Sequence, residues 1–205
     1  MSGKYDAIVI GGSAGSFEAI CTILKKLPEK FSLPLFVVLH LDQNPDSSLA
    51  HYLNKITKVD VIEANDKEEI QPGTVYIAPP NYHMLVEENR TISLSSDLKV
   101  CFSRPSIDVL FESAADVYGE KLIAVILSGA NSDGTKGFKK IKERGGMTIV
   151  QNPATAAFDY MPNSARDNNR IDHILSLEEI GTFLVGNSQS SYMACDNRDV
   201  NQYLY

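Results

Sequence analysis

The N-terminal part of the chain alternates between apolar strands and amphipathic helices, and this alternation constrains the fold more than any other feature. Residues 5–10 form a short apolar run that two glycines end, and residues 17–27 carry apolar side chains at helical spacing. A second apolar strand is predicted over 35–39 and a short helix over 47–55. This rhythm predicts a parallel sheet with helices on both faces.

The segment from 58 to 100 has a different sequence pattern, in which short strand-like runs are separated by residues typical of turns. We expect a β-rich insertion there and not another β-α-β unit. The further predicted elements are helices at 106–118, 135–144, 161–167 and 177–184 and strands at 122–127, 147–150 and 173–175. From residue 186 onward, Ser, Asn, Gln and Asp dominate. We therefore expect one domain over 1–185 and a polar tail over 186–205.

Composition excludes several classes of protein. The chain has 205 residues and a formal net charge of −7, which disfavours nucleic-acid binding because phosphate contacts need clustered Lys and Arg. The three cysteines form no C-x-x-C pair and the four histidines are dispersed, so neither a disulfide scaffold nor a metal site is expected. No apolar run approaches the roughly 20 residues of a membrane span, and no signal peptide is visible. We expect a cytoplasmic protein without a cofactor.

The first candidate for chemistry is the loop Gly11–Ser16, which follows the first predicted strand and opens a helix. Its letters match G-x-S-x-G, in which glycines permit a tight strand-to-helix turn that exposes a serine nucleophile, here Ser13. The free N–H groups of the helix start also favour negative charge there. A phosphate-binding loop and an ordinary helix cap remain alternatives, although the loop matches neither G-x-G-x-x-G nor a Walker A sequence.

Two further residues follow predicted strands. His40 ends the second strand and is a candidate general base, since its ordinary titration range suits accepting a proton from serine at neutral pH. Asp133 lies between the strand at 122–127 and the next helix, and is a candidate for the carboxylate that orients a histidine. A loop histidine with one hydrogen bond and an N-cap aspartate are the ordinary alternatives.

Taken together, Ser13, His40 and Asp133 all lie just beyond the carboxyl ends of predicted parallel strands. Ligand sites in open α/β sheets form at that edge, where the strand order reverses. If the first strand and the strand at 122–127 are neighbours at the reversal, Ser13 and Asp133 face one crevice and His40 reaches it from the side. The order Ser, His, Asp differs from the order in α/β-hydrolases, so such a triad would be a separate solution.

Four other residues are weaker candidates. Arg104 and Asn131 are candidates for binding polar groups of a substrate, with salt-bridge and turn roles as alternatives. His83, in the β-rich segment, is interpreted as structural or peripheral. Cys101 has neither a predicted helix start nor a basic neighbour that would activate its thiol.

Several blocks of the sequence resemble one family along nearly the whole chain. The blocks are IVIGGSAG at 8–15, EAND at 63–66, IQPGTVYIAPP at 70–80, YHM at 82–84, RPSIDVLF at 104–111, ILSGANSDG at 126–134, QN at 151–152 and MP at 161–162. On these blocks the chain resembles the catalytic domain of the chemotaxis-type protein-glutamate methylesterases, the CheB family.

The resemblance implies an α/β fold with a doubly wound, mostly parallel sheet in a Rossmann-like three-layer arrangement. It implies a serine hydrolase in which the nucleophile falls on Ser13, the histidine on His40 and the aspartate on Asp133. The implied reaction is hydrolysis of glutamyl methyl esters on chemoreceptors, and some members also deamidate receptor glutamine. The chain departs from the family pattern at Ala14, usually a hydroxyl-bearing residue, at Ser16, usually glycine, and at Gly129-Ala130-Asn131, usually Gly-Met-Gly.

We expect the Ala14 N–H, aided by the loop at Ala130, to form the oxyanion hole. The expected partners are methyl-accepting chemotaxis receptors, together with a separate receiver or methyltransferase protein, because no receiver domain is expected ahead of the first strand. Two other functions stay open. One is a non-catalytic receptor-binding adaptor, favoured by the departures at Ala14 and 130–131. The other is a nucleotide-binding oxidoreductase that would use Asp42 to bind a ribose.

Overall fold

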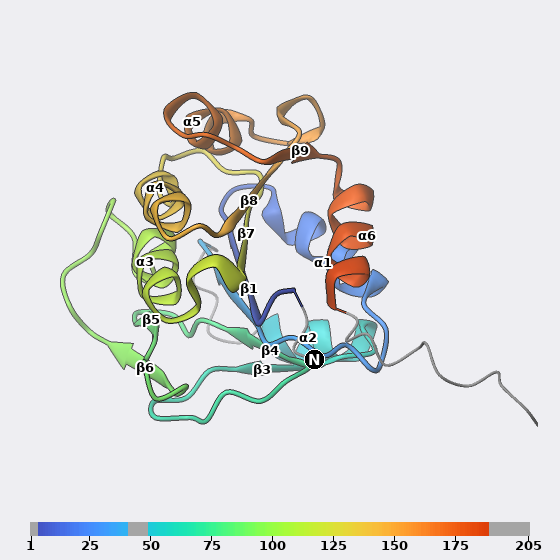
Figure 1. Cartoon of the computed structure of the whole chain (residues 1–205), viewed down its shortest axis with the longest axis vertical. Coiled ribbons are helices and arrows are strands. Elements are labelled where there is room, and N and C mark those ends of the chain that lie inside the picture. Colours follow the sequence, from blue (N-terminus) through green and yellow to red (C-terminus); the bar gives the residue numbers. More distant parts are fainter. Residues whose placement is uncertain (1–3, 41–48, 189–205) are drawn as a thin grey trace, which may run out of the picture.

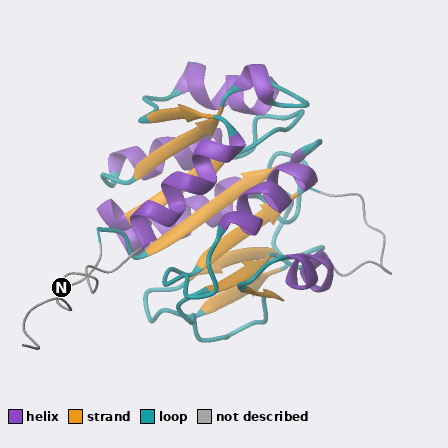
Figure 2. Ribbon diagram, turned by 90° about the vertical axis from the view of Figure 1, so that its right-hand side faces the viewer, coloured by secondary structure: helices purple, strands orange, loops and turns teal. Residues whose placement is uncertain are grey.

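A parallel β-sheet forms the centre of the protein in a computed structural model that describes residues 4–40 and 49–188 (Figures 1 and 2). Within these residues the sheet has seven strands in the order β3-β4-β2-β1-β7-β8-β9, and all neighbours are parallel. The strands are β1 (Ala7–Gly12), β2 (Leu35–Leu39), β3 (Asp60–Glu63), β4 (Thr74–Ile77), β7 (Leu122–Ile126), β8 (Met147–Gln151) and β9 (His173–Leu175). The predicted fold class is thereby confirmed.

Helices cover both faces of this sheet, as Figure 1 shows. One face is covered by α1 (Ser16–Lys26), α2 (Leu49–Ile56) and α6 (Leu177–Ser188), and the other by α3 (Ile107–Tyr118), α4 (Thr135–Glu143) and α5 (Tyr160–Asn168). Two short 3-10 helices, η1 (Gly119–Lys121) and η2 (Pro153–Thr155), join neighbouring elements.

The central strand explains why both layers are needed. Ile8 and Ile10 of β1 point into the core under α1 and α6, whereas Ala7 and Val9 point into the core under α3. All four side chains are completely buried. Burying a side chain such as isoleucine stabilises the fold by about 1.5–3 kcal/mol, so a strand that is apolar on both faces gains from a helix layer on each side.

The strand order reverses at β1, which has β2 on one side and β7 on the other. The register places Gly12 opposite Leu39 of β2 and Gly11 opposite Ile126 of β7. The prediction that the first strand and the strand at 122–127 are neighbours is confirmed. The carboxyl ends of β1, β2 and β7 therefore meet at one point of the sheet edge, where ligands bind in folds of this class.

The β-rich segment predicted over 58–100 divides into two parts. Strands β3 and β4 belong to the main parallel sheet, whereas β5 (His83–Val86) and β6 (Ile92–Ser95) form a separate antiparallel hairpin beside α3. The insertion is therefore smaller than predicted. The physical reason is that no helix connects β3 to β4, so the sequence lacks the helical period that marks a β-α-β unit.

Helix α6 spans the predicted boundary between the domain and the tail. Helix α6 continues to Ser188, past the predicted start of the tail at 186, and residues 189–205 lie outside the described part of the chain. The division into a catalytic domain over 1–185 and a tail stays a prediction. Among the described residues, no helix has both the length and the apolar content needed to cross a bilayer.

Candidate active site

Ser13 lies in the turn between β1 and α1, at the point where the strand order reverses. Its backbone N–H donates to the Ser128 carbonyl at 2.9 Å, and its own carbonyl accepts from the Ser16 N–H at 3.0 Å. The residue is 8% exposed. Its hydroxyl makes no hydrogen bond with any other residue of the described chain, so it stays available to react.

The turn around Ser13 requires glycine. Gly15 has a φ of 74°, a left-handed conformation that other residues adopt only at a cost. A Cβ atom built there would lie 2.6 Å from the Cβ of Ala157, closer than real Cβ atoms approach, and in tight contact with the Phe158 ring at 3.3 Å. The turn is also tied to the loop after β7, because the Ser128 hydroxyl donates to the Ala14 carbonyl at 2.7 Å. This hydrogen bond holds the turn that carries Ser13 against the loop that carries Asp133.

Asp133 lies in the loop between β7 and α4 and is completely buried at the N-terminus of α3. One carboxylate oxygen, Oδ1, accepts from the Ser106 hydroxyl at 2.9 Å and from the Asp108 N–H at 3.0 Å. The other oxygen, Oδ2, accepts from the Ile107 N–H at 2.7 Å. Asp133 thus caps a helix that belongs to another part of the chain, and the unpaired N–H groups of that helix start hold its charge.

The pKa of Asp133 follows from these contacts. Burial raises it, but the His40 ring and the N–H groups of Asp108 and Ile107 favour the charged form, and the net result is a pKa below the ordinary value. The carboxylate therefore carries a negative charge at neutral pH in spite of its burial.

His40 follows β2 and lies beside this carboxylate. Its Nε2 is 3.0 Å from Asp133 Oδ2, although Nε2 is buried and its geometry falls short of a hydrogen bond. Its backbone N–H donates to the Gly12 carbonyl at 3.0 Å, which fixes the histidine next to the residue that precedes Ser13. The structure therefore brings Ser13, His40 and Asp133 to one edge of the sheet, as the spacing predicts. It shows no hydrogen bond between Ser13 and His40, and such bonds often tighten only once substrate is bound.

The other ring nitrogen of His40 has two polar neighbours. Nδ1 lies 3.2 Å from the Asn131 side-chain nitrogen and 3.5 Å from the Ser103 hydroxyl. The sequence predicts that Asn131 binds substrate, whereas in the structure its side-chain amide contacts His40, the candidate catalytic histidine. That expectation about substrate binding stays a prediction.

Two backbone N–H groups, one in the serine turn and one in the loop after β7 that is bonded to this turn, are candidates for stabilising an oxyanion. Within residues 4–40 and 49–188, neither the Ala14 N–H nor the Ala130 N–H donates a hydrogen bond. Unpaired backbone donors near a nucleophile are the feature that an oxyanion hole needs. Both were expected from the sequence to contribute to it, and the departures from the family pattern at these positions change only side chains.

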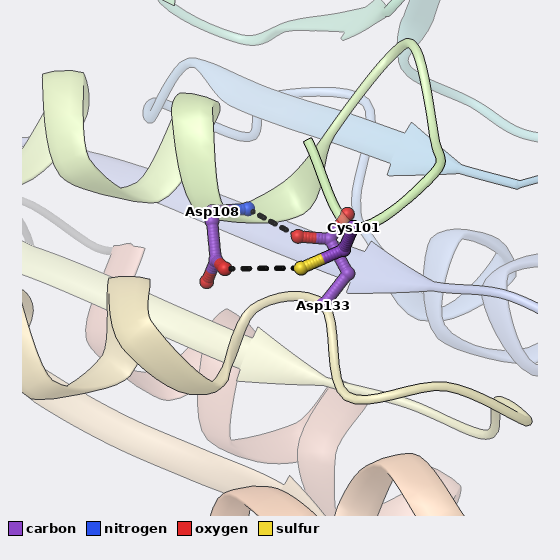
Figure 3. Close-up of side chains that lie close together, drawn as sticks. All are labelled: Cys101, Asp108 and Asp133. Carbon is purple, nitrogen blue, oxygen red and sulfur yellow. Dashed lines mark hydrogen bonds between the residues drawn. The ribbon is translucent and has the colours of Figure 1, made fainter. Parts of the chain in front are cut away.

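A second buried carboxylate, Asp108, lies beside Asp133, to which its backbone N–H donates (Figure 3). Burial raises the pKa of Asp108 to about 6, the Gly137 N–H at 2.8 Å opposes the rise, and the charge of Asp133 adds to it. The Cys101 thiol lies 3.9 Å from Asp108 Oδ2. Burial, followed by the charges of Asp133 and Asp108, raises the pKa of this thiol, so Cys101 is protonated at neutral pH.

These three residues are the set within the described chain that best resembles a metal site. One ligand atom from each of Cys101, Asp108 and Asp133 lies within 4.8 Å of the others. However, both oxygens of Asp133 already accept hydrogen bonds and Asp108 accepts one from Gly137. Internal hydrogen bonding therefore accounts for the cluster without an ion.

The loop that carries Ser103 and Ser106 is held in place by His83 and Arg104. His83 is buried, accepts from the Ser106 N–H at 3.1 Å and contacts the Leu98 carbonyl at 3.1 Å. Arg104 donates to the carbonyl groups of two residues of its own loop, 96 and 97. The structural interpretation of His83 agrees with these contacts, and the guanidinium of Arg104 is likewise engaged within the loop, so its expected role toward substrate stays a prediction.

Sequence reasoning missed three of the residues that build the site: Ser103, Ser106 and Asp108. An acid inside the apolar run IDVLF was a visible signal for the buried Asp108. By contrast, a pocket of about 380 Å³ lined by Tyr5, Tyr118 and neighbouring residues lies at the opposite, amino-terminal edge of the sheet. It contains none of the predicted site residues.

Comparison with known proteins agrees with this geometry. The CheB methylesterase family model matches residues 8–184. A Leptospira interrogans protein, provisionally named a protein-glutamate methylesterase/protein-glutamine glutaminase, is 50% identical over 188 residues, which cover 92% of this chain and 97% of that protein. The protein-glutamate methylesterase/protein-glutamine glutaminase of Thermotoga maritima is 37% identical, and the match covers 90% of this chain but 54% of that longer protein.

A solved structure extends the match to the fold. The crystal structure of the Thermotoga maritima CheB methylesterase catalytic domain aligns with a TM-score of 0.84 and 36% identity, covering 91% of this chain and 99% of that domain. The family match, the identities and the shared fold agree with one another, and the chain belongs to the CheB methylesterase family.

Proposed function

We propose that this protein hydrolyses glutamyl methyl esters on chemotaxis receptors, releasing glutamate and methanol, with Ser13, His40 and Asp133 as its catalytic triad. The observation that carries the proposal is the position of His40. Its ring lies 3.0 Å from a buried, charged carboxylate, and its backbone is bonded to the residue before an unpaired serine. A base held between a nucleophile and an orienting carboxylate is the arrangement that covalent ester hydrolysis needs.

In the first step, Ser13 Oγ attacks the ester carbonyl carbon while His40 accepts the hydroxyl proton. Nδ1 is the ring nitrogen that faces away from Asp133, so the proton goes to Nδ1 and the charge of Asp133 stabilises the resulting imidazolium. The carbonyl oxygen becomes an oxyanion, to which the N–H groups of Ala14 and Ala130 donate. Each such donor lowers the barrier by about 2.7–4 kcal/mol in serine hydrolases.

In the second step, the tetrahedral intermediate collapses and methanol leaves with the proton from His40, so that an acyl-enzyme on Ser13 remains. Water then attacks the acyl carbon, and His40 takes a proton from it. A second collapse returns this proton to Ser13 Oγ and frees the glutamate side chain. Atoms balance, because one water enters and one methanol leaves.

The same sequence of steps accommodates a glutamine side chain, in which His40 protonates a leaving ammonia. The relatives named protein-glutamine glutaminases support including this activity in the proposal. A separate receiver or methyltransferase protein stays a proposed partner. The oxidoreductase alternative rests on Asp42, which lies outside the described residues, and membership of the CheB methylesterase family favours the hydrolase.

A serine-reactive fluorophosphonate separates the hydrolase from the non-catalytic adaptor. We expect the folded protein to form one covalent adduct, which mass spectrometry places on Ser13, and to release methanol from methylated receptor. The variant Ser132→Ala is a matched control, because Ser132 is an exposed serine of the loop that carries Asp133. It should label and turn over as the unmodified protein does. Absence of labelling at Ser13 in protein with intact secondary structure would favour the adaptor.

A further inference from the structure

The side-chain amide of Asn131 bridges the two partners of the proposed base–carboxylate pair. Its oxygen, Oδ1, accepts from the Asp133 backbone N–H at 3.0 Å, and its nitrogen, Nδ2, lies 3.2 Å from His40 Nδ1. Asn131 is half-buried in the loop between β7 and α4. One side chain therefore contacts both residues through opposite ends of its amide.

The two ends of this amide cannot be exchanged. A backbone N–H can only donate, so the atom that faces the Asp133 N–H must be the amide oxygen. The NH₂ group is then the end that faces His40. An NH₂ group can only donate, and therefore Nδ1 of His40 must accept and carries no proton. The remaining proton of the neutral ring is on Nε2, which faces Asp133.

From this contact chain we infer that Asn131 is a positioning residue that holds His40 in the Nε2–H tautomer, with the Nδ1 lone pair ready to accept the Ser13 proton. The inference rests on the proposed role of His40 as the base. It gives Asn131 a role different from the substrate binding expected from the sequence, because its amide is occupied by enzyme groups at both ends.

The other neighbours of the ring determine the tautomer less firmly. The Ser103 hydroxyl, 3.5 Å from Nδ1, can donate or accept and so favours neither tautomer. Asp133 Oδ2 favours a proton on Nε2, but the geometry of that contact falls short of a hydrogen bond. Asn131 is thus the neighbour that requires Nδ1 to be unprotonated. Since Nδ1 has a single lone pair, the Ser13 hydroxyl replaces the amide there when the reaction begins.

The variant Asn131→Asp separates this role from a structural one. A carboxylate at 131 still accepts from the Asp133 N–H, so the loop keeps its hydrogen bond. Toward His40, however, it can only accept, and it therefore requires a proton on Nδ1. Asn131→Ala removes both contacts, and Ser132→Ala is a control in the same loop. Thermal unfolding of each variant shows whether its fold is retained.

Nitrogen-15 NMR of histidine-labelled protein reads the tautomer directly, and His40→Gln identifies the signals that belong to His40. For the unmodified protein and Ser132→Ala we expect an unprotonated Nδ1 and a protonated Nε2 in the neutral ring. For Asn131→Asp we expect a protonated Nδ1, and for Asn131→Ala a mixture. A protonated Nδ1 in the unmodified protein, or an Asn131→Asp spectrum identical to it, would overturn the inference.

Methanol release from methylated receptor gives a second readout. We expect Asn131→Asp and Asn131→Ala to lower kcat about 10-fold or more with KM unchanged, as partners that orient a catalytic group do. A raised KM with unchanged kcat would instead indicate substrate binding and contradict the inference. Full activity of Ser13→Ala would overturn the proposed function, whereas the NMR spectra would still report the tautomer, so the two failures are distinguishable.

Discussion

Two loops at the carboxyl edge of the sheet differ in whether their polar groups are hydrogen-bonded within the protein. In the loop after β7, both oxygens of Asp133 accept hydrogen bonds from the start of α3. In the turn after β1, the Ser13 hydroxyl and the Ala14 N–H make no hydrogen bond with other residues of the described chain. The loop after β7 contributes to stability, while the turn leaves its reactive groups unpaired and contributes little to stability. Pre-organised sites depend on such a division between supporting and reacting groups.

The largest effect on folding is expected when the supporting carboxylate is removed. Asp133→Ala leaves the Ser106 hydroxyl and the N–H groups of Ile107 and Asp108 without their acceptor. We expect the free energy of unfolding to fall by about 3–5 kcal/mol. Ser13→Ala removes an unpaired hydroxyl and should change it by less than about 0.5 kcal/mol. Urea unfolding of both variants measures the contrast, and equal losses would contradict the comparison of the two loops.

The two buried carboxylates should respond to pH with opposite signs. Because its pKa is lowered, Asp133 contributes stability above its ordinary pKa of 3.8, and this is lost as pH falls below that value. Because its pKa is raised to about 6, Asp108 destabilises the fold increasingly as pH rises from about 4 through 6.

The variant Asp108→Asn isolates the second carboxylate. It keeps an oxygen for the Gly137 N–H but cannot ionise, so it should be more stable than the unmodified protein by up to about 3 kcal/mol at pH 8. The difference should disappear below about pH 4. Denaturant unfolding at several pH values measures it. A variant that is less stable at pH 8 would show that the charge of Asp108 helps to hold the fold.

A smaller effect is expected from the glycine that shapes the serine turn. Gly15→Ala forces a side chain into a left-handed conformation and against Ala157, so we expect a loss of about 1–2 kcal/mol together with reduced methanol release. Gly186→Ala is the matched control, because a Cβ at Gly186 in α6 meets nothing within 4 Å. This control should raise the melting temperature slightly, since alanine favours helix. If both variants behaved alike, the turn would not need its glycine.

Much of the fold could be predicted because its signals are local. Buried strands read as apolar runs, and β2 and β9 occupy the predicted residues 35–39 and 173–175. The placement of β3 and β4 could not be predicted in this way, since the pairing of β4 with β2, which joins both strands to the main sheet, depends on contacts distant in sequence. Sequence patterns show that a segment is a strand, but they show less about which sheet it joins.

The residues of the site also fall into those that could be predicted from the sequence and those that could not. Ser13, His40 and Asp133 could be proposed because each follows a strand, and parallel strands end at one edge. The supporting roles of Asp108 and Asn131 could not. They depend on a helix start that packs against a distant loop and on a backbone N–H that orients an amide. The contact of Asn131 with the Asp133 N–H has the two-residue spacing of a turn, but the contacts of Asn131 with His40 and of Asp108 with Asp133 join segments distant in sequence and carry no spacing signal.

In the proposed mechanism, an unpaired serine beside a histidine–carboxylate pair performs ester hydrolysis. The most direct test is the rate of methanol release from methylated chemoreceptor by the unmodified protein and by Ser13→Ala, at equal concentrations of folded protein. We expect the substitution to lower the rate at least about 1,000-fold while the fold is retained. A Ser13→Ala protein that releases methanol at the unmodified rate would contradict this mechanism.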